Sequence, residues 1–258
     1  MKLKWLGTAG FRVEANGCIF LIDPYLTRNK QSRPVQTLQP ADLAGAGQIF
    51  ITHGHFDHLH DVPAIMTGNA TEVYCSEVAA ATLISQGVNS GLVHAVKEDG
   101  CSFGFAGFRA RAFFSRHVKF DIPLVARTLL RIRKGHRRLS KMSSSYPPGQ
   151  VLSWRFTLDG YTMHHFGSAG STRGELARIA GQPLDLLLVP LQGHSSICDI
   201  AFQYVRILKP RLAIPHHQDD FYPPISTSVD IEPFITRVRA SCPQTEVRVM
   251  QLNETITL

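Results

Sequence analysis

The sequence has no long hydrophobic run. None of its apolar stretches approaches the roughly 18 residues that a helix needs to span a bilayer. The basic start, residues 1–4, is not followed by the apolar stretch of a secretory signal peptide. We therefore expect no integral membrane segment and a cytoplasmic location.

The chain is also poor in cysteine, with 5 in 258 residues. Their number is odd, they are widely scattered, and no C-x-x-C pair occurs. This distribution argues against a disulfide framework and against a cysteine-rich zinc site. We expect reduced thiols in the core or at the surface.

Acidic residues are nearly absent from residues 118–150, where Asp121 is the single acid. This segment holds much of the basic charge of a chain whose net charge is +7. Its basic residues are Lys119, Arg127, Arg131, Arg133, Lys134, Arg137, Arg138 and Lys141. We expect it to form a basic helix-loop insertion.

Within this insertion, the apolar positions Val125, Leu129 and Ile132 have helical spacing, which predicts an amphipathic basic helix over Pro123–Arg133. The serines and prolines of Gly135–Gly149 predict a loop. The helix can simply present a solvated face. Alternatively, it can act as a lid or arm that attracts an anionic substrate, a phosphorylated head group or a membrane surface.

The remaining sequence is typical of one globular domain, and we expect residues 1–258 to form it. Strands joined by glycine-rich turns are expected first, at Lys2–Leu6, Gly10–Glu14 and Cys18–Ile22. Strands and helices then alternate, with late strands at Leu184–Val189 and Leu212–Ile214. This order predicts an α/β fold whose site lies along the carboxyl edge of its strands.

The most informative feature is the segment Thr52–His58, which has the pattern H-x-H-x-D-H. It follows a short apolar run that predicts a buried strand. Residues two apart project to the same side of a strand end, so His53 and His55 can bind one ion. Asp57 and His58 can face a second ion nearby. Imidazole and carboxylate ligands suit zinc, iron or manganese.

Several short motifs occur in an order that is similar to that of the metallo-β-lactamase superfamily. They are Trp5–Phe11, Leu21–Tyr25, Thr52–Asp61, Ser115–His117, His165–Ser168, Pro190 and Ile214–His217. The chain resembles in particular the branch that contains ascorbate-phosphate lactonase and N-acyl-phosphatidylethanolamine phospholipase D. The resemblance implies a four-layer αβ/βα sandwich, the metallo-β-lactamase fold, with a metal site at one edge of two sheets.

The resemblance also implies ligand sets. The first metal site matches His53, His55 and His117, and the second matches Asp57, His58 and His217. His216 adjoins His217, but only His217 fits the family's spacing. Zinc is the expected metal, with manganese or iron as alternatives.

Two positions depart from the family's pattern. The family has an aspartate that bridges both metals, and this chain has Ser168 there, after Gly167. A serine hydroxyl is a poor ligand and brings no negative charge to hold two dications together, so we expect one ion and a weak or empty second site. Thr8 stands where relatives of this branch carry histidine, which indicates a changed substrate pocket.

The expected chemistry is hydrolysis by metal-activated water. Asp57 can act as general base, and His194 is a candidate for substrate or metal contact, with a packing role in its loop as the alternative. His165 and Asp23 are expected to support ligands by hydrogen bonds rather than to bind metal.

The leading hypothesis is therefore a metal-dependent hydrolase of an anionic or lipid-like ester, phosphodiester or lactone. Two alternatives remain. The basic segment and the superfamily's nucleases suggest a nucleic-acid processing or binding protein, although aromatic residues for base stacking are absent from the segment until Tyr146. Ser168 suggests a degenerate, non-catalytic metal-binding module.

Overall fold

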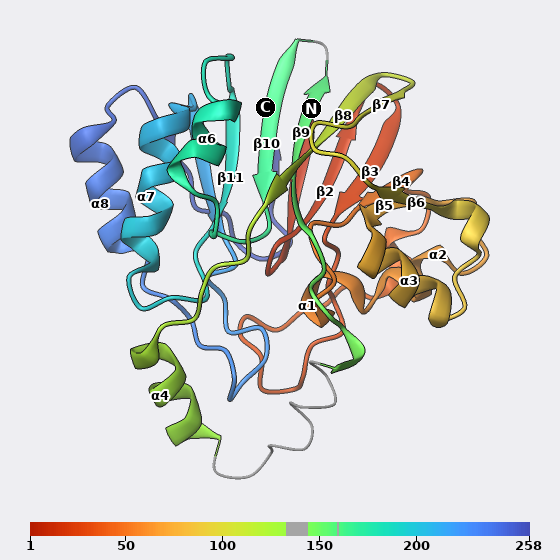
Figure 1. The fold of residues 1–258 in the computed structure, drawn as a ribbon, viewed down its shortest axis with the longest axis horizontal. Coiled ribbons are helices and arrows are strands. Elements are labelled where there is room, and N and C mark those ends of the chain that lie inside the picture. Colours follow the sequence, from red (N-terminus) through yellow and green to blue (C-terminus); the bar gives the residue numbers. More distant parts are fainter. Residues whose placement is uncertain (133–143, 159) are drawn as a thin grey trace.

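The structure is a computed structural model and describes residues 1–132, 144–158 and 160–258. In this part of the chain, two mixed sheets of seven strands pack face to face, with helices on their outer faces (Figure 1). The first sheet has the order β14-β1-β2-β3-β4-β5-β6. Its strands are β1 Lys2–Gly7, β2 Gly10–Ala15, β3 Cys18–Ile22, β4 Gln48–Phe50, β5 Glu72–Ser76, β6 Val93–Val96 and β14 Thr255–Thr257.

The second sheet has the order β13-β12-β11-β10-β9-β8-β7. Its strands are β7 Ser102–Phe105, β8 Phe108–Ser115, β9 Val151–Leu158, β10 Tyr161–Phe166, β11 Leu186–Pro190, β12 Leu212–His216 and β13 Glu246–Val247. In each sheet, antiparallel pairs come first along the chain, and parallel pairs follow, from β3 to β6 and from β10 to β13. The last strand, β14, returns to pair antiparallel with β1. The second half of the chain thus repeats the plan of the first.

Helices cover the outer face of each sheet (Figure 1). On the first sheet these are α2 Val62–Met66 and α3 Glu77–Ser85, and on the second they are α6 Arg173–Ile179, α7 Ile197–Leu208 and α8 Glu232–Ser241. The short helix α1 Phe56–Leu59 lies at one edge of the sandwich, and α4 Ile122–Arg131 projects beyond that edge (Figure 1). Among the described residues there are also two 3₁₀ helices, η1 Pro40–Leu43 and η2 Ser90–Leu92.

Strand β11 shows why the chain folds into four layers. All of its residues are buried, so it reads as a continuous apolar run rather than an alternating one. Leu186 and Leu188 enter the core between the sheets, while Leu187 and Val189 enter the core under the helices of the second sheet. Because successive side chains of a strand point to opposite faces, a strand that is apolar throughout needs a cover on both sides. The expected four-layer αβ/βα sandwich is confirmed.

The structure places the predicted basic helix at Ile122–Arg131, close to the expected bounds. Residues 133–143, which carry Arg133, Lys134, Arg137, Arg138 and Lys141, lie outside the described residues. Among the residues that the structure describes, no helix is long and apolar enough to cross a membrane.

Candidate metal centre

The H-x-H-x-D-H segment leaves the end of β4 through a tightly fixed turn. The Thr52 amide and hydroxyl both donate to the Asp23 carboxylate, at 2.7 and 2.6 Å. The Gly54 amide donates to the carbonyl of Pro148 at 2.9 Å, and a Cβ atom at Gly54 would lie 2.2 Å from the carbonyl oxygen of Pro147. Glycine is therefore required between the two histidines, because any side chain there would push the neighbouring backbone away.

The first three predicted ligands come together. One ring nitrogen from each of His53, His55 and His117 lies within 4.8 Å of the other two. His117 follows β8 and reaches this point from the other sheet. Ligands held about 2.1 Å from one zinc ion lie at most about 4.2 Å apart, so small side-chain adjustments bring this triad to coordination geometry.

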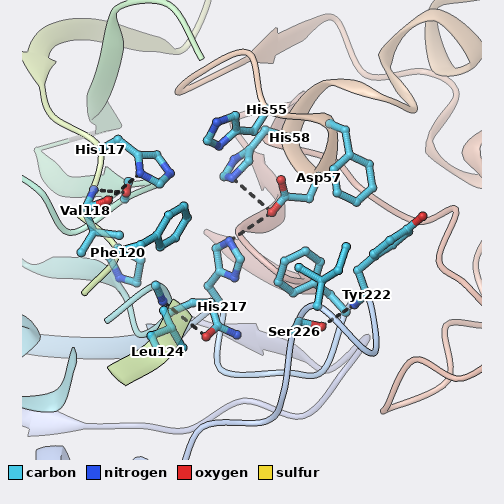
Figure 2. Close-up of a pocket in the computed structure, with 18 of the residues that line it drawn as sticks. His55, Asp57, His58, His117, Val118, Phe120, Leu124, His217, Tyr222 and Ser226 are labelled. Carbon is cyan, nitrogen blue, oxygen red and sulfur yellow. Dashed lines mark hydrogen bonds and ion pairs between the residues drawn. The ribbon is translucent and has the colours of Figure 1, made fainter. Parts of the chain in front are cut away.

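Hydrogen bonds on the far side of the rings fix two of these histidines. The Nδ1 of His117 donates to the Val118 carbonyl at 2.7 Å (Figure 2), which leaves Nε2 with a free lone pair. The Nδ1 of His53 lies 3.1 Å from the Thr52 hydroxyl, whose proton goes to Asp23. Such bonds set the tautomer and the orientation that a metal ligand needs.

The second predicted set also converges. Ligand atoms of Asp57, His58 and His217 lie within 4.8 Å of one another. The Asp57 Oδ2 is 3.3 Å from His217 Nε2 and 3.6 Å from His58 Nε2, and Figure 2 shows all three side chains directed at one point. All six predicted ligands line a single cavity.

The structure separates the two adjacent histidines after β12. His217 has a left-handed backbone (φ 63°) that turns its ring into the cavity, and its amide donates to the Thr8 carbonyl at 2.9 Å. His216 is fully buried and stacks on His165, with ring centroids 4.9 Å apart. The geometry therefore brings His217, and not His216, to the cluster.

Burial and mutual repulsion keep the first triad neutral. Burial, reinforced by the neighbouring histidines, lowers the pKa of His53 far below its usual value. Burial likewise lowers the pKa of His55 to about 4, against the opposing charge of Asp57. It also lowers the pKa of His117, although the bond to the Val118 carbonyl opposes the shift. A neutral imidazole is the form that binds a metal, so this triad is prepared for one at physiological pH.

The second triad carries charge instead. Burial opposes the charge on His58, but Asp23 and Asp57 outweigh it and raise the pKa of His58. Burial also opposes ionisation of Asp57, and the charge of His58 with the hydrogen bond from His217 outweighs it, so the pKa of Asp57 is below its usual range. The carboxylate is thus available as a ligand or as a proton acceptor.

Asp23 supports both triads, as the sequence suggested. It is fully buried, and its Oδ2 lies 2.8 Å from His58 Nδ1 and 3.3 Å from His165 Nε2. Through Thr52 it also fixes the turn that carries His53. His165 therefore contacts Asp23, the residue that orients the predicted ligand His58.

We expect Asp23→Asn to weaken metal binding by about 10- to 100-fold, the usual effect of losing a partner that orients a ligand. An amide offers only one acceptor oxygen, and its NH₂ group would face donors from Thr52, His58 or His165. Competition with a chromogenic chelator measures the affinity.

Asp61→Asn is the matched control for this variant. Asp61 is also buried, but it accepts hydrogen bonds from the Leu26 and Thr27 amides, at 2.5 and 2.8 Å. The Asp61→Asn variant should lower the free energy of unfolding and leave the metal affinity unchanged. Equal metal affinity in Asp23→Asn and the unaltered protein would show that Asp23 does not orient the ligands.

Ser168 lies two residues after β10 and lines the cavity. Its hydroxyl oxygen accepts a hydrogen bond from the Val118 amide at 2.9 Å. The preceding Gly167 has no room for a side chain, because a Cβ atom there would lie 2.0 Å from the Thr52 hydroxyl. The turn is therefore closely packed against the first sheet, and Ser168 is the side chain that it presents to the cavity.

Thr8 is fully buried and is not among the described residues that line the cavity, so it does not shape the pocket directly. Its amide donates to both oxygens of Asp219, and its hydroxyl accepts from Arg28 at 3.0 Å. Arg28 and Asp219 form a buried ion pair at 2.6 Å. Because Thr8 also holds the His217 amide, this network links the start of the chain to a predicted ligand.

His194 is not brought into the cluster. Its Nδ1 accepts a hydrogen bond from the Ser196 amide at 2.9 Å, and Asp121 lies 3.9 Å away. The neighbouring Gly193 lines the cavity, but His194 is not among the described residues that do so. This position favours the packing role, and a contact with substrate stays a prediction.

Comparisons with known proteins agree with this geometry. The family model "Beta-lactamase superfamily domain" matches residues 2–217. A "UPF0173 metal-dependent hydrolase" from Aeropyrum pernix is 29% identical over 256 residues, which are 98% of this chain and 96% of that protein. These similarities leave the narrower branch as a prediction.

Solved structures share the fold. Igni18, described as a metallo hydrolase from Ignicoccus hospitalis, is similar with a TM-score of 0.72 and 22% identity over 99% of this chain and 97% of its own. An isothiocyanate hydrolase from Delia radicum gut bacteria is similar with a TM-score of 0.69 and 15% identity, over 100% of this chain and 99% of its own.

Proposed function

The chain belongs to the β-lactamase superfamily domain family and is a metal-dependent hydrolase, and we propose that it uses metal-activated water to cleave an ester, phosphodiester or lactone. The observation that supports this chemistry best is the first triad. Three neutral imidazoles converge, and hydrogen bonds fix two of them from behind. Three protein ligands with an open position are typical of a catalytic zinc site.

Each residue has a role in this proposal. His53, His55 and His117 would hold the metal, which when bound would lower the pKa of its water to about 7. Asp57 lies beside the triad as an ionised carboxylate and can accept a proton from the water. His58 and His217 hold Asp57 in place and, together with it, would bind a second ion if one is present. Zinc is the proposed metal, with manganese or iron as alternatives.

Metal removal tests the proposal. Dialysis against a chelator should abolish hydrolysis of any substrate found in an ester, phosphodiester and lactone screen, and one molar equivalent of zinc, manganese or iron should restore it. Elemental analysis of the purified protein identifies the metal. Full activity in metal-free protein would refute the proposed mechanism.

A nucleic-acid substrate is the alternative that the basic segment supports. Arg127 and Arg131 are exposed on α4, close to the cavity, where they could contact phosphates. Salt-sensitive gel shifts with RNA or DNA would favour this alternative. We favour a small-molecule substrate over nucleic acid, and we propose a cytoplasmic location for the protein.

A further inference from the structure

The cavity beside the two triads has a volume of about 340 Å³, at the small end of ligand sites. Its walls are mainly apolar. Phe120 and the α4 residues Leu124 and Leu129 form one side, and Phe221, Tyr222 and Ile225 form the other. Figure 2 shows Phe120 and Leu124 across from Tyr222, with His217 and Asp57 between them.

Charge is confined to one end of this cavity. Among the described residues that line it, there is no lysine, arginine or glutamate, and Asp57 in the second triad is the single carboxylate. Arg127 and Arg131 lie on the same helix as the apolar wall but do not line the cavity. A charged substrate group placed against this wall would lose part of its hydration and would meet no lysine or arginine among the described lining residues, which is unfavourable in free energy.

Apolar side chains at the cavity also remain open to solvent. Phe120 is 59% exposed, Leu129 54% and Val125 43%. Covering such surface is favourable in proportion to the apolar area removed from water. An apolar group in the cavity would gain this free energy, and a polar group of the same size would not.

We propose that the substrate carries an uncharged apolar acyl chain, which occupies this cavity while the scissile bond lies at the triads. This inference rests on the proposed hydrolysis for its reaction. With an acyl ester, the water oxygen bonds to the acyl carbon and the bond from that carbon to the leaving oxygen breaks. One water proton goes to the leaving alcohol, and the acid product ionises. Substrate selection then depends on hydrophobic contact within the cavity, and not on the basic residues outside it.

A series of 4-nitrophenyl esters tests this inference on the metal-loaded protein. From acetyl through butyryl and hexanoyl to octanoyl, kcat/KM should rise roughly fourfold for each methylene that enters the cavity. The adipoyl half-ester matches the hexanoyl ester in length but ends in a carboxylate. It should be at least about tenfold poorer. A flat series, or a preference for the half-ester, would overturn the inference.

Two variants of one helix locate the effect. Leu124→Gln places an amide in the apolar wall and should raise KM for the octanoyl ester about tenfold, and by less for the acetyl ester. Leu130→Gln is the matched control, because Leu130 is 78% exposed and is not among the residues that line the cavity. Equal loss in both variants would contradict the assignment of the wall.

A binding measurement separates this inference from the proposed reaction. Calorimetric titration with 1-octanol requires no turnover, and binding that Leu124→Gln weakens supports the apolar cavity even if no ester is cleaved. Turnover of short esters without octanol binding and without a chain-length effect would leave hydrolysis standing and refute the apolar group.

Discussion

Replacing His53 and His55 together with alanine should leave the purified protein without a bound transition metal and without hydrolytic activity. The two residues supply two of the three nitrogens in the first triad, and His117 alone cannot complete a coordination shell. Each ligand bond contributes to the free energy of metal binding. Losing two of three bonds should therefore lower the affinity by more than about 1,000-fold. Elemental analysis after gel filtration measures the metal content directly.

The control for this variant replaces two histidines outside the triads. His60 is exposed and contacts the Tyr146 hydroxyl, and His94 is partly exposed and pairs with Glu72. Their double replacement should leave metal content unchanged. If the His53 and His55 variant kept its metal while replacement of His58 and His217 removed it, the principal ion would belong to the second triad.

The ligand cluster illustrates how much of this site the sequence could predict. Four of the six proposed ligands lie within one short segment, so local spacing and the expected strand end were sufficient to group them. His117 and His217 lie far away in the sequence, on the other sheet. Their place followed from the order of the family's motifs, because no local pattern indicates that two distant strand ends meet.

The cavity wall could not be predicted in the same way. The sequence placed Val125 and Leu129 on an apolar stripe, but the segment around α4 was interpreted through its charge, since all but one of its charged residues are basic. In the structure, the same helix directs Leu124 and Leu129 into the cavity, while Arg127 and Arg131 do not line it. The composition of a helix gives its charge, but it does not show which face of the helix lies against the cavity. The opposite wall, Phe221 to Ile225, lies in an irregular segment that has no periodicity from which to infer its position.

Changing Ser168 to aspartate should raise the metal content from about one ion per chain toward two. Asp57, His58 and His217 already converge, but they bring only one carboxylate to a site that must hold a second dication near the first. Ser168 lines the same cavity, and its oxygen accepts the Val118 amide at 2.9 Å, a bond that a carboxylate oxygen can keep. The other oxygen would then add a ligand and a negative charge between the two positions.

The variant Ser168→Asn separates charge from shape, because asparagine has the size of aspartate without its charge. If mutual repulsion of the cations limits the second site, aspartate should raise metal content and asparagine should not. Titration with zinc followed by elemental analysis measures both variants and the unaltered protein. Two tightly bound ions in the unaltered protein would refute the argument, because the charge that Asp57 supplies would then suffice to hold both. A rise in both variants would mean that an added ligand atom, and not an added charge, was missing from the second site.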